Sequence, residues 1–174
     1  MRSDIKDYLC NICNKENIRV VWLENLSPYT PPSASFEHRC IVMNPNWHNK
    51  FEFTFQLAHE MAHILRGDET DVCFYDTSFK NKTGIEYETN LVAVRLLVPF
   101  YCSDTEIRDI SVYDFLNSYC IPHYLADVAK NEITKFFNRN FKSVNNGEYI
   151  LYWKLHYYDE LLIDTKRKEL KHYD

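Results

Sequence analysis

Residues 55–65 read Phe-Gln-Leu-Ala-His-Glu-Met-Ala-His-Ile-Leu, a mostly apolar stretch that holds His59, Glu60 and His63. Its apolar residues lie nearly all round a helical wheel, so we predict a buried helix that starts near Asn49 or Lys50, runs to Arg66 and has Gly67 as its C-cap. Two histidines four residues apart project from one face of a helix and can reach one metal ion. Polar side chains on a buried helix need bonding partners, and a metal ion bound by both histidines provides one. The alternative is a pair of hydrogen-bonded histidines in the core.

Glu60, which lies between the two predicted ligands, is the candidate catalytic residue. Glu60 follows His59 directly, so its carboxylate cannot reach the metal in the same way and points beside the ligands. This is the H-E-x-x-H arrangement, in which zinc activates a water molecule and the glutamate acts as general base. The sequence therefore predicts a zinc-dependent peptidase with Glu60 as the catalytic base.

A catalytic zinc ion normally takes three protein ligands, so the two histidines leave one to be found. We predict a second helix over about residues 85–98, ended by Pro99, and it carries two carboxylates near its start. Glu88 lies one turn before the apolar Val92 and is the favoured third ligand. Glu86 lies about 160° from Glu88 around the helix, so it is the competing candidate and both cannot bind the metal.

Composition and length place limits on the rest of the protein. With 174 residues, we expect one metallopeptidase domain over 1–138 and a strand and tail extension over 139–174 packed on it. The net charge of −5 argues against direct nucleic-acid binding. A polar start and the lack of a long apolar run favour a cytoplasmic protein with no membrane contact, and its six cysteines are then mostly reduced. The sequence leaves the oligomeric state open.

The remaining patterns predict a mainly helical α+β fold. Its elements are expected in this order: a helix over 4–17, a strand over 18–23, a loop over 27–33, a strand over 38–43, helices around 104–118 and 122–138, and a strand over 149–153. The segment 111–138 could pass for a helix-turn-helix, but it has few basic residues and no glycine in the turn.

Three parts of the chain together resemble the ImmA/IrrE metallopeptidases of bacteria, phages and mobile elements. These are Met43-Asn44-Pro45, the H-E-x-x-H helix, and Glu88-Thr89-Asn90-Leu91-Val92-Ala93 with Leu96-Leu97-Val98-Pro99. The family pattern is a strand that ends in Asn-Pro, the H-E-x-x-H helix, and a helix that reads roughly E-A-N-x-F-A-x-x-L-L-M-P. The chain departs from it at Thr89, Val92 and Val98, and none of these changes removes a chemical group.

The resemblance implies a compact zincin-like fold with a small antiparallel or mixed sheet packed on the active-site helix. Carried over residue by residue, it implies zinc ligands His59, His63 and Glu88, with Glu60 as general base. Family members often cleave a helix-turn-helix repressor encoded beside them, so a repressor of a mobile element or stress response is the expected substrate.

Three further interpretations depend on the structure. Tyr101 could direct its hydroxyl at a developing oxyanion. The strand over 38–43, if it is a sheet edge, could pair with an extended peptide. The alternative function is a zinc-stabilised, non-catalytic regulator that binds and sequesters a partner protein.

Overall fold

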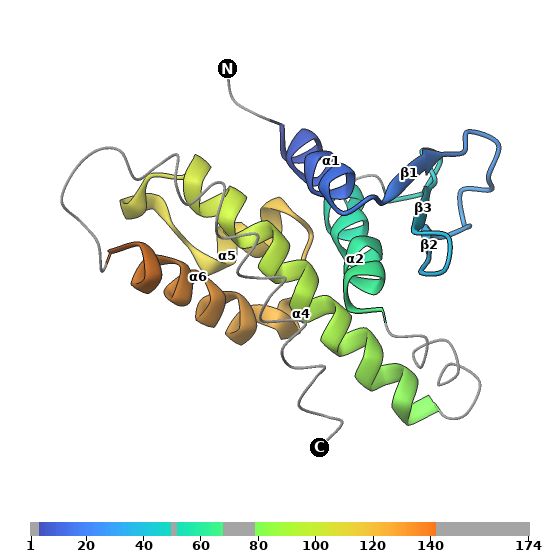
Figure 1. Cartoon of the computed structure of the whole chain (residues 1–174). Helices are drawn as coiled ribbons and strands as arrows, with labels where there is room; N and C mark the ends of the chain where they lie inside the picture. The colour runs from blue at the N-terminus through green and yellow to red at the C-terminus, as the bar shows by residue number, and fades with distance from the viewer. Residues whose placement is uncertain (1–3, 50–51, 68–78, 142–174) are drawn as a thin grey trace.

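The computed structural model describes residues 4–49, 52–67 and 79–141 (Figure 1). The predicted strand over 149–153 lies outside these residues. Residues 139–141 of the predicted extension belong to the last described helix, and residues 142–174 lie outside the described part of the chain. The division of the chain into a domain over 1–138 and an extension therefore stays a prediction.

The small sheet has three strands in the order β1-β3-β2 and is mixed. β1 (Arg19–Trp22) runs parallel to β3 (Cys40–Met43), and β2 (Ser33–Ser35) runs antiparallel to β3. The predictions of strands over 18–23 and 38–43 are confirmed with shorter bounds. β2 was not predicted, because it has only three residues and directly follows a segment rich in proline.

The turn after β3 is held by a buried side chain. Asn44 is fully buried, and its Nδ2 donates to the carbonyls of Ser27 at 2.7 Å and Thr30 at 2.8 Å. Its Oδ1 accepts from the backbone N–H of Asn46 at 2.9 Å. The loop over 27–30 is thus tied to the end of β3, just before the chain enters the H-E-x-x-H helix.

Helix α1 (Ile5–Lys15) precedes the sheet, and α2 (Phe53–Arg66) follows it. The side chain of Asp4 caps α1 by accepting from the N–H of Lys6. α2 starts later than predicted, and Gly67 caps its C-terminus. Glycine at position 67 lets the end of α2 lie close to Phe36, which directly follows β2. A Cβ at this position would lie 2.0 Å from the ring of Phe36.

The long helix α4 (Phe79–Asp104) lies against α2 and continues through Pro99, so the prediction that Pro99 ends this helix is wrong. A proline inside a helix removes one hydrogen bond and costs about 3 kcal/mol. The residues around Pro99 are buried in the core, which offsets that cost: Leu96, Leu97, Val98, Tyr101 and Cys102.

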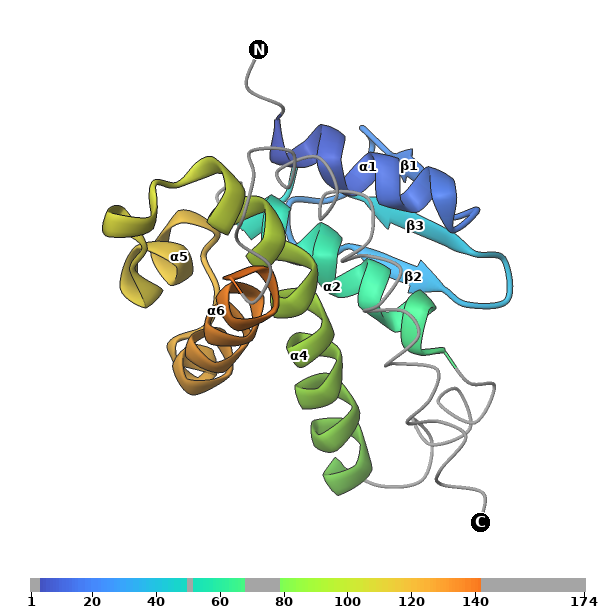
Figure 2. The same ribbon diagram turned by 60° about the vertical axis from the view of Figure 1, so that its left-hand side comes forward.

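The chain then forms a smaller helical layer on the far side of α4. Its elements are η2 (Ile107–Asp109), α5 (Val112–Ser118), η3 (His123–Leu125) and α6 (Ala126–Phe141). Figures 1 and 2 show the order of the layers, with the sheet and α1 next to α2, then α4, then α5 and α6. A mostly helical domain with one small mixed sheet packed on α2 confirms the predicted α+β class.

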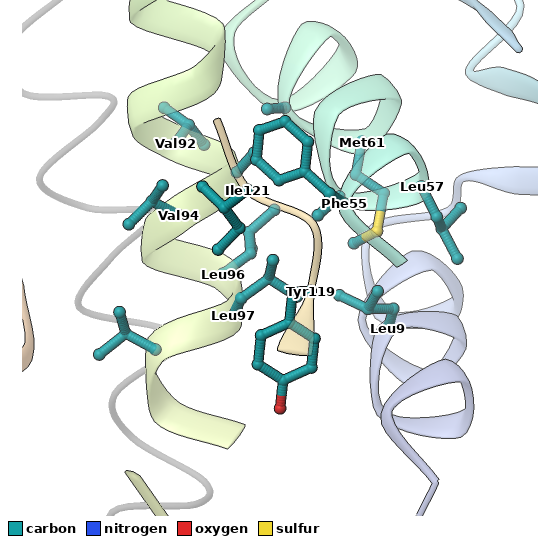
Figure 3. Close-up of a cluster of buried hydrophobic side chains, with 14 of the residues drawn as sticks. Leu9, Phe55, Leu57, Met61, Val92, Val94, Leu96, Leu97, Tyr119 and Ile121 are labelled. Atoms are coloured by element: carbon teal, nitrogen blue, oxygen red, sulfur yellow. The ribbon is translucent and has the colours of Figure 1, made fainter. Parts of the chain in front are cut away.

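The core lies where these layers meet (Figure 3). Side chains from α1, α2 and α4 meet those of the turn after α5, and the labelled ones are Leu9, Phe55, Leu57, Met61, Val92, Val94, Leu96, Leu97, Tyr119 and Ile121. α2 is thus held from several sides, which fixes the direction of the polar side chains on its remaining face.

Candidate metal centre

Three ligand-type atoms converge where α2 and α4 lie side by side. The Nε2 atoms of His59 and His63 are 3.0 Å apart. Oε2 of Glu86 lies 3.2 Å from Nε2 of His59 and 3.7 Å from Nε2 of His63. Within the described part of the chain, these residues form the one group of three or more His, Cys, Asp or Glu that could hold a metal ion.

The spacing of these atoms fits a small tetrahedral ion. Ligand atoms at 2.0–2.1 Å from a zinc ion at tetrahedral angles are separated by about 3.3 Å. The three observed separations of 3.0, 3.2 and 3.7 Å lie on either side of that value. The donor set of two imidazoles and one carboxylate also matches the ligands of catalytic zinc sites. The residues present therefore fit the metal.

The structure places Glu86, and not the predicted Glu88, beside the histidines, so the choice of Glu88 is corrected. The prediction used Val92 as the mark of the inward face, but α4 is buried on two sides, against α2 and against α6. Val92 and Glu88 lie about 160° from Asn90, which contacts His59, so they point away from α2. Glu88 is exposed, whereas Glu86 lies one turn before Asn90 and is partly buried.

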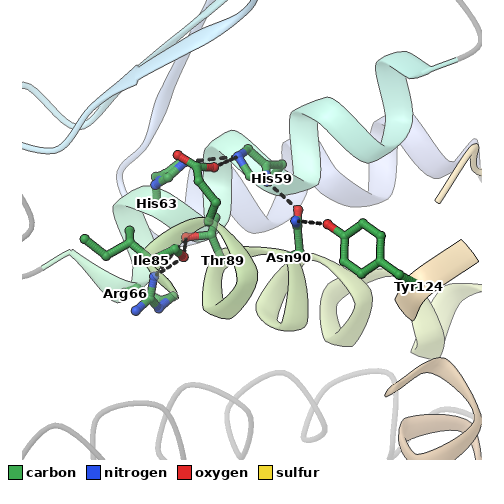
Figure 4. A network of polar contacts seen from close by, with 8 residues as sticks. His59, His63, Arg66, Ile85, Thr89, Asn90 and Tyr124 are labelled. Atoms are coloured by element: carbon green, nitrogen blue, oxygen red, sulfur yellow. Dashed lines mark hydrogen bonds and ion pairs between the residues drawn. The ribbon is translucent and has the colours of Figure 1, made fainter. Parts of the chain in front are cut away.

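Asn90 connects the centre to a third element of the fold. Nδ1 of His59 and Oδ1 of Asn90 are 2.8 Å apart, and Nδ2 of Asn90 donates to the hydroxyl of Tyr124 in η3 at 2.8 Å (Figure 4). Sequence reasoning missed both residues. The position of Asn90 one turn after Glu86 could have indicated it, but no sequence signal pointed to Tyr124.

Arg66 joins the C-terminus of α2 to the segment of α4 that carries Glu86. Its Nη1 donates to the carbonyl of Ile85 at 3.2 Å and to the hydroxyl of Thr89 at 2.8 Å (Figure 4). The Thr89 hydroxyl donates in turn to the same Ile85 carbonyl. These bonds tie residues on both sides of Glu86 to α2.

Glu60 lies on α2 with the two histidines, and the charges of His59, His63 and Glu86 all act on its carboxyl group. Burial raises the pKa of its carboxyl group above the ordinary value and outweighs the opposite effect of the two histidines. A glutamate whose pKa is raised toward neutrality is well suited to take up a proton and give it back.

The histidines and Glu86 shift each other's pKa in the metal-free protein. Burial by itself would lower the pKa of His59, but hydrogen bonds to Glu86 and Asn90 and the charge of Glu60 raise it above 6.5. Hydrogen bonds from His59 and His63 hold the pKa of Glu86 well below its usual range. Glu86 is therefore an anion at neutral pH, as a metal-binding carboxylate must be.

Two of the further interpretations of the sequence are wrong. The buried Tyr101 exchanges hydrogen bonds with the backbone of Ser111, which keeps its hydroxyl away from the centre. β3 is the central strand and is paired on both sides, so it cannot accept an added peptide strand.

The comparison with protein families agrees with this geometry. Residues 13–101 match the peptidase family M78, described as the IrrE N-terminal-like domain. The chain belongs to this family. The matched residues include β1 to β3, α2 and most of α4, and so His59, Glu60, His63 and Glu86 lie within the M78 match. Family M78 supports a metallopeptidase type of function for the chain.

No curated protein and no solved structure gave a significant match. In the part of the chain that the structure describes, no helix has the length and apolar character needed to cross a membrane.

Proposed function

We propose that this M78 protein is a zinc-dependent endopeptidase whose metal ligands are His59, His63 and Glu86. The observation that carries the proposal is the convergence of three ligand atoms, 3.0–3.7 Å apart, beside a partly buried glutamate. A site that serves stability alone more often closes with a fourth protein ligand and has no use for that glutamate.

Each residue has a defined role in hydrolysis. When bound, zinc supplies Lewis acidity, which polarises the scissile carbonyl and acidifies a water molecule. Glu60 accepts the proton of that water as it attacks and then transfers the proton to the leaving amine. Its raised pKa suits both transfers. Asn90 accepts from Nδ1 of His59 and leaves Nε2 directed at the site of the metal.

A cytosolic helix-turn-helix repressor is the substrate we propose. The support for this proposal is the resemblance to the ImmA/IrrE peptidases, whose members often cleave such a protein encoded beside them. The first substrate to test is thus a small helix-turn-helix protein encoded next to this chain. Its appearance as two fragments, with one new N-terminus, is the expected result.

Replacement of Glu60 by Gln tests the enzymatic role. The Glu60→Gln variant should keep its bound zinc, measured by elemental analysis, because Glu60 is not a proposed ligand. Its cleavage of a proteome-derived peptide library, read as new N-termini by mass spectrometry, should fall by about 10²- to 10⁴-fold. The exposed Glu88, changed to Gln, is the matched control and should cut normally. Equal cleavage by wild type and Glu60→Gln would exclude Glu60 as the catalytic base, and a zinc-loaded wild type that cuts nothing would favour the sequestering regulator.

A further inference from the structure

Tyr124 brings a part of the chain outside the family match into contact with the metal centre. It lies in η3, beyond residues 13–101, and 63% of its surface is exposed. Even so, its hydroxyl accepts a hydrogen bond from the buried Asn90, whose other amide atom contacts His59 (Figure 4). One line of polar contacts therefore joins η3, α4 and α2.

The directions of the hydrogen bonds follow from how the Asn90 amide lies. Its Nδ2 faces the Tyr124 hydroxyl, which accepts the N–H, and its Oδ1 faces His59. That oxygen can only accept, and therefore Nδ1 of His59 carries the proton. A neutral imidazole protonated at Nδ1 has its lone pair on Nε2, the atom that faces Glu86 and His63.

We propose that Asn90 and Tyr124 are positioning residues, with Tyr124 holding the Asn90 amide in place and Asn90 setting the tautomer and ring orientation of His59. This inference rests on the proposed metal site. The helical layer that follows α4 thus takes part in the peptidase centre, and removal of the Tyr124 hydroxyl weakens metal binding.

The first test is zinc affinity, measured by competition with a chelating dye. Asn90→Ala should bind Zn²⁺ about 10- to 100-fold more weakly. Tyr124→Phe keeps the exposed ring and removes one neutral hydrogen bond, so we expect a loss of about two- to tenfold. In the Asn90→Ala background, Tyr124→Phe should have no further effect, because it acts only through the amide. Asn90→Asp keeps the acceptor and should bind at least as tightly as wild type.

The matched control is Tyr113→Phe. Tyr113 lies in the neighbouring α5, is exposed to a similar extent at 66%, and its ring contacts His123 and not the metal centre. Its zinc affinity should equal that of the wild type.

A second readout needs neither metal nor activity. In the metal-free protein, an Nδ1–H of His59 that is hydrogen-bonded to Oδ1 of Asn90 gives a slowly exchanging proton resonance after nitrogen labelling. This resonance should persist in wild type and Tyr113→Phe, broaden in Tyr124→Phe and be lost in Asn90→Ala. Wild-type resonance and wild-type zinc affinity in both Asn90→Ala and Tyr124→Phe would overturn the proposal. A fall in melting temperature with the resonance unchanged would also overturn it, because that result marks a purely structural role.

The two proposals fail separately. If wild type binds zinc and the variants lose affinity as expected, but no peptide is cut, the endopeptidase is excluded and the positioning roles stand. If wild type binds no zinc, the proposed function fails, and the metal-free resonance still decides whether Tyr124 and Asn90 orient His59.

Discussion

At the scale of single residues, the identity of the proposed third metal ligand is the most direct point to test. Glu86→Gln keeps the size of the side chain but removes its charge, so we expect zinc affinity to fall by more than about 100-fold, since loss of a partner behind a ligand already costs 10- to 100-fold. Glu88→Gln, two residues along on the exposed side of α4, is the control and should leave the affinity unchanged. Chelator competition measures both. A loss in Glu88→Gln alone would restore the original choice of ligand.

The charges of these residues also make the stability of the metal-free protein depend on pH. The pKa of His59 is raised above 6.5, so its contribution is complete below 6.5 and is lost as the pH rises through the raised value. The pKa of Glu86 is lowered from 4.5, so its contribution is complete above 4.5 and is lost as the pH falls toward the lowered value. Both contributions are therefore present between about pH 4.5 and 6.5.

We expect the melting temperature of the metal-free protein, recorded with a chelator present, to fall as the pH rises from about 6 to 8.5. Glu86→Gln removes the largest of the effects that raise the pKa of His59, so this fall should become smaller in that variant. Glu88→Gln should retain the wild-type fall. An equal fall in wild type and Glu86→Gln would show that other groups control the pH dependence.

The residues of the site differ in how far the sequence alone could predict them. His59, Glu60 and His63 lie within one turn of one helix, so their mutual placement follows from helical geometry. The placement of Glu86 depends on which side of α4 faces α2. Hydrophobicity cannot decide this, because α4 is buried on two sides. Tyr124 reaches the site only through the path of the chain after α4, which local patterns do not contain.

At the scale of secondary-structure elements, the end of α2 is fixed by one close contact. Gly67→Ala would place a Cβ 2.0 Å from a ring carbon of Phe36, and we expect the crowding to cost about 1–3 kcal/mol of unfolding free energy. Gly84→Ala in α4 is the matched control. With nothing within 4 Å of its Cβ, it should stabilise the protein by about 0.5–1 kcal/mol.

Urea denaturation of these variants measures both changes. Removal of the ring by Phe36→Ala should abolish most of the loss of unfolding free energy caused by Gly67→Ala, because the clash is with that ring. A neutral Gly67→Ala, or an undiminished cost in the Phe36→Ala background, would contradict the close contact.

The elements themselves show where sequence patterns lose their predictive power. The strands β1 and β3 and the helices α1 and α2 were predicted, because each has an apolar period, a long apolar stretch or a β-branched run. The three-residue β2 owes its existence to pairing with β3, a contact that its own sequence does not indicate. The helix α4 continues past Pro99 because packing against its neighbours outweighs the local preference of proline to end a helix.

At the scale of the whole molecule, a partly buried ion pair joins α4 to α6. Nε of Arg95 lies 3.2 Å from Oε1 of Glu132, and the exposed fractions of these side chains are only 17% and 7%. Lys135 also contacts Glu132, at 2.8 Å, from an exposed position. Since η3 leads directly into α6, this pair helps to hold the layer that places Tyr124 beside Asn90.

Removal of one partner should therefore be more harmful than replacement of both. Glu132→Ala leaves the guanidinium of Arg95 without its buried carboxylate, and we expect a loss toward the lower end of about 3–5 kcal/mol, because Arg95 keeps some access to water. The double variant Arg95→Met with Glu132→Leu fills the same space with apolar groups and should recover most of the stability. Glu106→Ala, which breaks the exposed pair with Arg108, is the control and should change little. Calorimetry of these variants checks the order. If the double variant is no more stable than Glu132→Ala, the layers are held together by the ion pair itself and not by the packing around it.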